Sequence, residues 1–160
     1  MRALNIIILI VASIILVLDQ GSKILATSLL NYNVSYDVIR NFFYLTLNKN
    51  YGAAFGILSG SNNILVVISV GAIIIISRYI KNFKKNVRNN IAFGLLLGGI
   101  TGNLIDRIFM GYVRDFLDVK IFNYNFPIFN IADAAVVIGT FLLIISIFKG
   151  EDINENNRTK

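Results

Sequence analysis

Residues 128–148 read IFNIADAAVVIGTFLLIISIF and contain one charged side chain, that of Asp133. A helix needs about 20 mainly apolar residues to cross the hydrocarbon core of a bilayer. This segment is long and apolar enough to do so, with its charge close to one end. The sequence therefore predicts a membrane-spanning helix here.

Three further apolar segments precede it, at Ala3 to Leu18, Ile64 to Ser77 and Ile91 to Ile105. Each is shorter than a full span, so we extend each one into its polar flanks. The chain has 160 residues, of which 56% are hydrophobic and 15% are charged, a composition too apolar for a soluble domain. We predict a single membrane domain over residues 1–160, with helices at about 3–23, 62–80, 91–109 and 128–148.

Basic residues near the ends of the spans predict the orientation, because they gather on the cytoplasmic side. The loop between the second and third spans has a dense block of Lys and Arg over residues 78–88 and no acidic residue. We therefore expect this loop, both termini and a tail over 150–160 to be cytoplasmic. The connections at about 24–61 and 108–127 then lie outside. We attribute the net charge of +6 to these cytoplasmic Lys and Arg residues, and we expect no nucleic-acid partner.

The outer region over about 31–60 is expected to contain a small β element. Val38 to Leu47 is rich in β-branched and aromatic residues, which favour a strand or hairpin. The second outer connection, through 123–127, has aromatic and turn-forming residues suited to a membrane interface. The predicted fold class is an all-α polytopic membrane protein with four transmembrane helices and a small extracytoplasmic β element.

The chain has no Cys and no His. Disulfides, thiolate nucleophiles, Cys-ligated metals, imidazole bases and Ser-His-Asp triads are thereby excluded. Catalysis has to use Asp, Glu, Lys, Ser, Thr or Tyr, and we expect neither a metal nor a cofactor.

Four aspartates fall at the outer membrane face of this topology: Asp19, Asp106, Asp115 and Asp133. Ionisable groups at membrane depth are costly and generally mark a functional site. Two adjacent carboxylates share one proton, because repulsion prevents both from ionising. One can then activate a water while the other, protonated, polarises a peptide carbonyl. The residues alone leave open which two touch.

Five motifs, in this order along the chain, resemble those of the lipoprotein signal peptidases, also called type II or prolipoprotein signal peptidases, an aspartic peptidase family. They are Asp19-Gln20-Gly21-Ser22-Lys23, Asn50-Tyr51-Gly52-Ala53-Ala54-Phe55-Gly56, Gly99-Ile100-Thr101-Gly102-Asn103-Leu104-Ile105-Asp106-Arg107, Val113-Arg114-Asp115-Phe116 and Phe129-Asn130-Ile131-Ala132-Asp133-Ala134-Ala135. The resemblance implies that Asp115 and Asp133 are the catalytic pair. It implies supporting or substrate-binding roles for Asp19, Lys23, Asn50, Gly99, Asn103, Asp106, Arg107 and Asn130.

The same resemblance implies the reaction. An endopeptidase removes the signal peptide from bacterial prolipoproteins, cutting just before a cysteine that carries a diacylglyceryl group. The enzyme then lies in the bacterial cytoplasmic membrane with its site on the extracytoplasmic side, and its partners are modified precursors and membrane lipids. We expect a monomer, in which the connection from Asn31 to Gly60 forms a cradle or flap over the substrate.

Several of these residues admit plainer interpretations. Asp19 and Lys23 stand one helical turn apart, which suggests a helix-end ion pair worth a few tenths of a kcal/mol. Asp118 competes with Asp115, because the two share a face if that stretch is helical. Arg114 stands where an apolar residue is expected, and it either lowers the pKa of Asp115 or points to solvent.

Asp133 stands where a helix dipole favours a carboxylate, and the asparagines could cap helices or turns.

Two other functional classes stay open. A small transporter or channel component would relay ions through buried acids, although such acids should follow a midplane path rather than crowd one surface. A Ser/Lys peptidase would use Ser22 and Lys23, although these are adjacent and no outer catalytic domain is expected.

Overall fold

The computed structural model describes residues 2–52, 58–122 and 124–151 of the chain. Within these residues, four helices are long and apolar enough to cross a membrane. They are α1 (Arg2–Leu29), α2 (Asn62–Tyr79), α3 (Val87–Met110) and α4 (Ile131–Phe148). A small antiparallel sheet accompanies them, so the predicted fold class of a four-helix membrane protein with a small β element is confirmed.

The helices differ from the predicted boundaries at their polar ends. α1 continues to Leu29 rather than ending near residue 23. α3 begins at Val87, after the N-cap Asn86, and α4 begins at Ile131, after the N-cap Asn130. Each asparagine side chain accepts a hydrogen bond from a backbone N–H of the first turn, which stabilises the helix start. Capping residues, not the limits of the apolar runs, therefore set these two starts.

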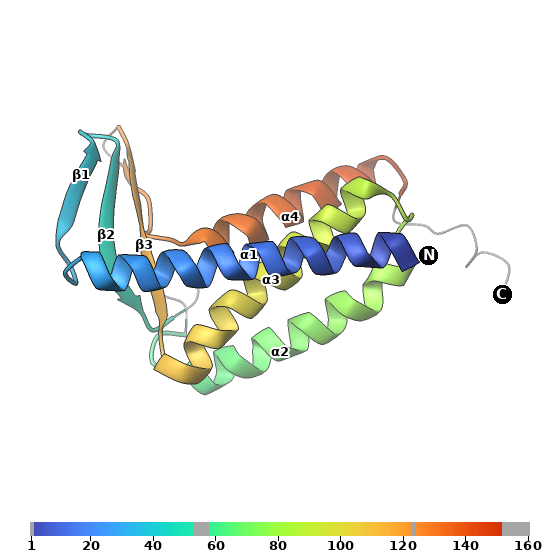
Figure 1. The fold of residues 1–160 in the computed structure, drawn as a ribbon, viewed down its shortest axis with the longest axis horizontal. Coiled ribbons are helices and arrows are strands. Elements are labelled where there is room, and N and C mark those ends of the chain that lie inside the picture. The colour runs from blue at the N-terminus through green and yellow to red at the C-terminus, as the bar shows by residue number, and fades with distance from the viewer. Residues whose placement is uncertain (1, 53–57, 123, 152–160) are drawn as a thin grey trace, which may run out of the picture.

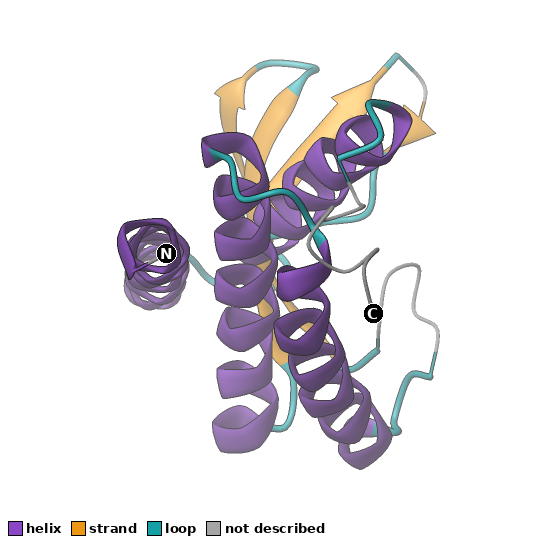
Figure 2. Ribbon diagram, turned by 90° about the vertical axis from the view of Figure 1, so that its right-hand side faces the viewer, coloured by secondary structure: helices purple, strands orange, loops and turns teal. Residues whose placement is uncertain are grey.

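α3 is the central helix and packs against α1, α2 and α4 (Figure 1). The start of α1 and the end of α4 lie at one end of the bundle and the sheet lies at the other (Figure 1). Figure 2 views the bundle from the end where α1 begins, with the strands behind the helices. The outer faces of α1, α2 and α4 expose large apolar side chains such as Leu9, Val67 and Val137. Such surfaces suit contact with lipid tails.

The described strands form one antiparallel sheet in the order β1-β2-β3-β4. β1 (Ser35–Ile39) and β2 (Phe43–Asn50) come from the connection between α1 and α2. β3 (Val113–Ile121) and β4 (Tyr124–Asn125) come from the connection between α3 and α4. The β element predicted over 31–60 accounts for only the first two strands. Pairing of β2 with β3 joins the two long connections at one end of the bundle.

Glycines of α3 let the neighbouring helices approach closely. A Cβ atom on Gly98 would lie 2.7 Å from the carbonyl oxygen of Ala12 in α1. A Cβ atom on Gly99 would lie 2.5 Å from the carbonyl oxygen of Ala132 in α4. No side chain fits at these distances, so α1 and α4 contact the α3 backbone directly, as small residues commonly allow between membrane helices.

We expect Gly98→Ala to destabilise the protein by about 1–3 kcal/mol, the usual cost of overpacking a filled interior. Gly71→Ala in α2 is the matched control, because a Cβ atom there meets nothing within 4 Å. Denaturant unfolding of both variants in one detergent measures the difference. Equal stability of the two variants would contradict close contact between the backbones of α1 and α3.

Candidate active site

A cavity of about 740 Å³ lies where the sheet meets α3 and α4. Its polar wall includes Asn50, Asn103, Arg107, Asp115 and Asp133. Apolar residues line much of the remainder, among them Ile100, Val136, Val137, Phe126, Pro127, Ile128 and Phe129. An apolar cavity with a few convergent polar groups is the usual form of a small-molecule or peptide-binding site. Five of the predicted site residues thus meet in one cavity wall.

Asp133 lies in the first turn of α4, where a reciprocal capping interaction holds it. The side-chain oxygen of Asn130 accepts a hydrogen bond from the Asp133 N–H at 2.9 Å, and Asp133 Oδ2 accepts one from the Asn130 N–H at 3.2 Å. Asp133 Oδ1 accepts a further bond from Asn103 Nδ2 at 2.7 Å. The interpretation of Asp133 as a helix-start carboxylate is therefore correct, and the same carboxylate lines the cavity.

Asp115 comes from β3, where it lies opposite Asn48 of β2. Its two carboxylate oxygens accept hydrogen bonds from Asn50 Nδ2 at 2.9 Å and from Asn130 Nδ2 at 2.6 Å. Burial, and then the negative charge of Asp133, raise the pKa of Asp115 to about 7. Asp115 therefore keeps a proton at pH values where an ordinary aspartate is ionised. Asn130 contacts both carboxylates, with its amide on Asp115 and its backbone N–H on Asp133.

Lys23 lies behind Asn103 and is fully buried. Its Nζ donates to Asp19 Oδ2 at 2.8 Å and to Asn103 Oδ1 at 2.9 Å, and it lies 3.5 Å from Asp106 Oδ2. The side chains of Lys23 and Asp19 are both 0% exposed, so the interpretation as a weak helix-end pair is wrong. Asn103 accepts at its oxygen from Lys23 and donates at its nitrogen to Asp133. Lys23 therefore orients the side-chain amide of Asn103, which in turn donates to Asp133.

Asp106 and Arg114 form a second buried ion pair. Arg114 Nη2 donates to Asp106 Oδ1 at 2.7 Å, and its Nε and backbone N–H donate to Oδ2 at 3.2 and 3.0 Å. Arg114 is 4% exposed, so the expectation that it points to solvent is wrong, and its guanidinium is directed at Asp106 rather than at Asp115. Gln20 joins this pair, because its Oε1 accepts from Arg114 and its Nε2 donates to Asp106. Neither Gln20 nor Arg114 was among the predicted site residues, although both lie within the quoted motifs.

Arg107 connects α3 to the segment after β2. Its Nη2 donates to the carbonyl oxygen of Gly52 at 3.2 Å. The rest of the motif that contains Gly52, residues 53–57, lies outside the described residues. Gly99 contacts the carbonyl group of Ala132, next to Asp133 in the chain, so its position is one of close packing beside the cavity.

Asp118 is separated from Asp115 because this segment is a strand rather than a helix. Side chains alternate between the faces of a strand, so residues three apart point to opposite sides. Asp118 accepts a hydrogen bond from Thr46 Oγ1 at 2.7 Å, and Thr46 also contacts the Ser35 hydroxyl at 2.8 Å. Asp118 is absent from the described cavity wall, so it is buried in a different environment from Asp115.

A family model described as signal peptidase (SPase) II matches residues 11–149 of the chain. The chain belongs to the signal peptidase II family. It is therefore an enzyme of an aspartic peptidase family, as the resemblance of its motifs predicted. Four apolar helices agree with a membrane-embedded signal peptidase II.

Similar proteins agree with this assignment. A lipoprotein signal peptidase of Staphylococcus haemolyticus (strain JCSC1435) is 43% identical over 148 residues, which span 92% of this chain and 94% of the relative. A lipoprotein signal peptidase of Staphylococcus aureus is 37% identical over 153 residues, which span 95% of this chain and 94% of the relative.

Two solved structures, both described as bacterial membrane enzymes determined by the in meso method, have the same fold. The structure at 2.3 Å resolution has a TM-score of 0.84 and 36% identity, and the match covers 96% of this chain and 91% of that chain. The structure at 1.9 Å resolution has a TM-score of 0.81 and 38% identity, with 89% and 92% covered.

Membership of the signal peptidase II family favours a peptidase over a transporter, and an aspartic peptidase over a Ser/Lys peptidase. The side chains of Ser22 and Lys23 also have separate partners. Ser22 Oγ donates to the carbonyl oxygen of Asp19 at 2.9 Å, whereas Lys23 Nζ is directed at carboxylate and amide oxygens.

Proposed function

We propose that the protein removes the signal peptide from diacylglyceryl-modified bacterial prolipoproteins, with Asp115 and Asp133 as its catalytic pair. Membership of the signal peptidase II family supports cleavage of signal peptides from prolipoproteins. The observation that carries the pairing is the position of Asn130, whose amide bonds Asp115 at 2.6 Å while its backbone N–H bonds Asp133 at 3.2 Å. Both carboxylates also line one cavity.

In this mechanism the two carboxyl groups share one proton, because burial and repulsion oppose a second negative charge. The ionised carboxylate takes a proton from a water molecule, whose oxygen attacks the scissile carbonyl carbon. The protonated carboxyl gives its proton to the carbonyl oxygen. When the tetrahedral intermediate collapses, the C–N bond breaks, the leaving nitrogen takes one proton, and the hydroxyl proton returns to the pair. The pair then again holds a single proton.

Three asparagine side chains support the pair in this proposal. Asn50 and Asn130 donate to Asp115, and Asn103 donates to Asp133. An amide N–H can bond a carboxylate or the carbonyl oxygen of a carboxylic acid. These donors therefore hold both groups in place while the proton moves between them and the substrate.

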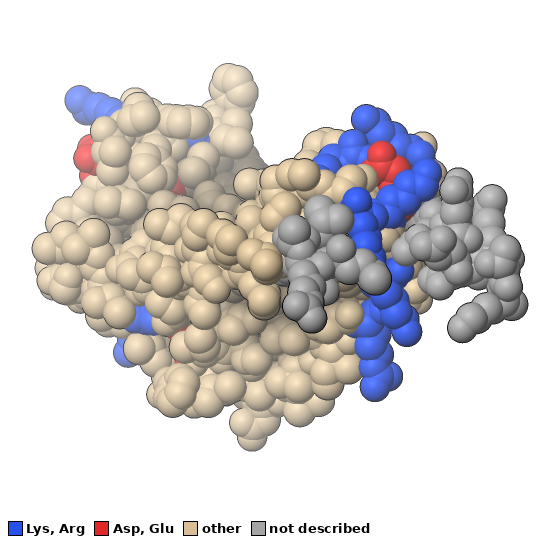
Figure 3. Space-filling view, turned by 45° about the vertical axis from the view of Figure 1, so that its right-hand side comes forward, with Lys and Arg blue, Asp and Glu red and all other residues tan. Residues whose placement is uncertain are grey.

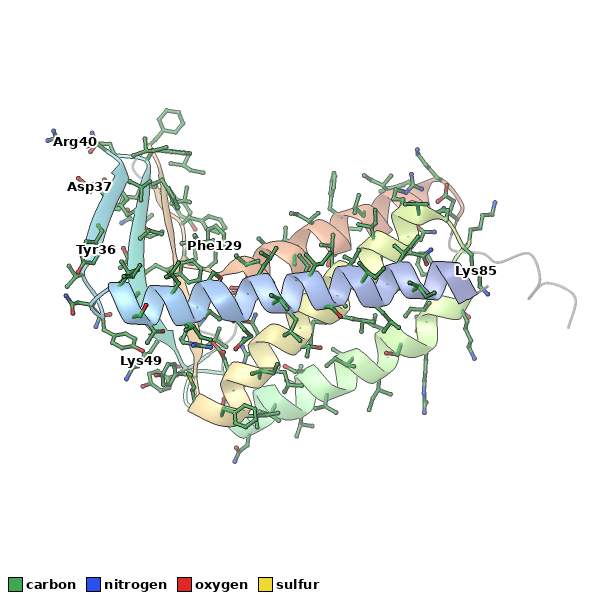
Figure 4. All side chains as sticks on the ribbon, in the orientation of Figure 1. Tyr36, Asp37, Arg40, Lys49, Lys85 and Phe129 are labelled. Carbon is green, nitrogen blue, oxygen red and sulfur yellow. The ribbon has the colours of Figure 1, made fainter. Side chains whose placement is uncertain are left out.

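We place the catalytic pair on the extracytoplasmic side. Lys and Arg side chains gather at the end of the bundle where α1 begins and α4 ends (Figure 3), and Lys85 is labelled there in Figure 4. The sheet and the start of α4 lie at the opposite end (Figure 1). Asp115 is in strand β3 of this sheet, and Asp133 is in the first turn of α4. Basic residues at the ends of spans stay on the cytoplasmic side. Both termini are then cytoplasmic.

A lipid-modified substrate suits the composition of the cavity. Ile100 of α3 and Val136 and Val137 of α4 continue the cavity wall along the spanning helices. A diacylglyceryl group can remain in this apolar environment while the adjacent peptide bond reaches the carboxylates at the interface. Both aspartates come from one chain, so each copy carries a complete catalytic pair, and we propose that the protein works as a monomer.

Incubation of the purified protein with a diacylglyceryl-modified precursor and with its unmodified twin tests the proposed function. We expect cleavage of the modified precursor only, just before the lipidated cysteine, seen as a mobility shift on a gel and located by mass spectrometry. Equal cleavage of the two precursors, or none of either, would contradict the proposal.

We expect the cleavage rate to fall as pH rises through about 7, the pKa of Asp115. Burial and the charge of Asp133 raise this pKa, so the shared proton is retained below that pH and lost above it. The dependence of kcat/KM on pH reports the pKa values of the essential groups in the free enzyme. A rate that stays constant into the alkaline range would show that no proton of this carboxyl is needed.

A further inference from the structure

The far end of the sheet carries an apolar surface that the catalytic proposal does not use. It consists of Ile39, Phe42, Ile121, Phe122 and Tyr124, here called the apolar tip. Phe122 is 98% exposed, and the other four side chains are between 48% and 57% exposed. All five lie outside the four candidate spans. Contact of the spanning helices with lipid tails therefore does not explain why these side chains are exposed.

Two neighbouring turns form the apolar tip. Ile39 pairs with Phe43 around the first turn, and Ile121 pairs with Tyr124 around the second. The backbone N–H of Lys120, beside the second turn, donates a hydrogen bond of 2.8 Å to the carbonyl oxygen of Phe42 in the first turn. This bond holds the two turns together. The tip is therefore one continuous surface rather than two unrelated loops.

The sheet runs across the bundle, and its tip projects beyond α4 (Figure 1). In Figure 4, Arg40 marks this end of the sheet and Lys49 marks the opposite end. From the tip, the chain passes through Phe126 and Pro127 in the cavity wall into α4. The tip is thus connected by a short segment to the first turn of α4, one of the four candidate spans.

Phe122 has a backbone conformation that is unusual for its residue type. Its φ of 53° lies in the left-handed region, which Gly and Asn adopt readily and bulky residues adopt rarely. A turn facing water would ordinarily carry one of those smaller residues, as Asn41 does in the neighbouring turn with a φ of 63°. A fully exposed Phe at this position is therefore unusual for a turn that faces only water.

The composition around the tip fits a lipid surface. Aromatic side chains are enriched where hydrocarbon meets headgroups, and Lys and Arg beside them meet lipid phosphates. Arg40 is exposed in the first turn, and Lys120 lies 4.3 Å from the ring centroid of Tyr44 at the same end of the sheet. Apolar, aromatic and cationic side chains thus occur together, next to a helix whose exposed apolar face suits contact with lipid tails.

We propose that the apolar tip inserts into the headgroup region of the outer leaflet beside α4, as a bilayer contact additional to the four spans. The contact holds the end of the sheet, and with it the segment that forms part of the cavity wall, at the level of the lipid surface. It does not depend on which carboxylates carry out the reaction.

The chain has no tryptophan, so a single introduced Trp reports its own surroundings. Phe122→Trp places the reporter at the tip, and Phe141→Trp, 61% exposed in α4, is the spanning control. Both full-length variants are reconstituted in vesicles whose lipids carry bromine either near the headgroup or deep in the acyl chains. Acrylamide added to the water phase is the second quencher, and an unchanged unfolding midpoint shows that each variant keeps the fold.

We expect the Trp at position 122 to emit at blue-shifted wavelengths and to lose most of its emission when bromine lies near the headgroup. Acrylamide should quench it weakly, and the Trp at position 141 should respond most to deep bromine. Strong acrylamide quenching with no bromine effect at 122 would overturn the proposal in favour of a tip in water. Protection from both quenchers would overturn it in favour of a protein contact, such as a second copy of the chain.

Discussion

We expect Asp115→Asn and Asp133→Asn each to slow cleavage of a diacylglyceryl-modified precursor by about a thousandfold, because each removes one partner of the acid–base pair. An amide in place of Asp115 cannot hold the shared proton, and an amide in place of Asp133 cannot accept a proton from water. Single-turnover assays on gels, with enzyme in excess, separate this loss from changes in substrate binding.

Asp118→Asn is the matched control for these variants. Asp118 lies in the same strand as Asp115 and is also buried, at 7% exposure, but its carboxylate bonds Thr46 rather than Asn50 and Asn130, which bond Asp115. We expect this variant to keep nearly the wild-type rate. Near-normal turnover by Asp115→Asn or by Asp133→Asn would remove that residue from the catalytic pair.

Lys23→Met should lower the free energy of unfolding by about 3–5 kcal/mol, the usual cost of removing one partner from a buried ion pair. Methionine is similar in length, but it leaves the carboxylates of Asp19 and Asp106, both 0% exposed, without this cation. It also leaves Asn103 without one of its two hydrogen-bond donors. Denaturant unfolding in one detergent measures the change.

Arg88→Met is the comparison for Lys23→Met. Arg88 pairs with Glu151 near the other end of the bundle, where the side chains are 27% and 22% exposed. Solvent weakens such a pair, so this substitution should destabilise the protein far less than Lys23→Met does. If Lys23→Met proved no more destabilising than Arg88→Met, the network around Lys23 would not be a buried support of the site.

The helices could be predicted from the sequence because lipid imposes a simple requirement. A run such as residues 128–148, with Asp133 as its single charge, has few alternatives to a spanning helix. β3 was not predicted, because Arg114, Asp115 and Asp118 interrupt the apolar pattern of a buried strand. Each of these buried charges has a hydrogen-bond partner from another part of the chain: Asp106 for Arg114, Asn130 for Asp115 and Thr46 for Asp118.

The candidate site shows the same division between local and distant information. The motifs selected Asp115, Asp133, Asn50 and Asn103, which the structure brings to one cavity. The spacing of Asp19 and Lys23 predicted their contact but not their burial, because Lys23 reaches Asn103 from 80 positions away. Arg114 was misinterpreted for the same reason: its acceptors lie on α3 and α1, and local sequence gives no sign of them.

Infrared spectroscopy of the resting enzyme can detect directly whether the two carboxyl groups share a single proton. We expect a protonated-carboxyl stretching band that titrates near pH 7. The band should persist in Asp118→Asn, disappear from this range in Asp115→Asn, and shift to lower pH in Asp133→Asn, where the repelling charge is gone. Absence of such a band in the wild-type protein, or its persistence unchanged in Asp115→Asn, would contradict the account.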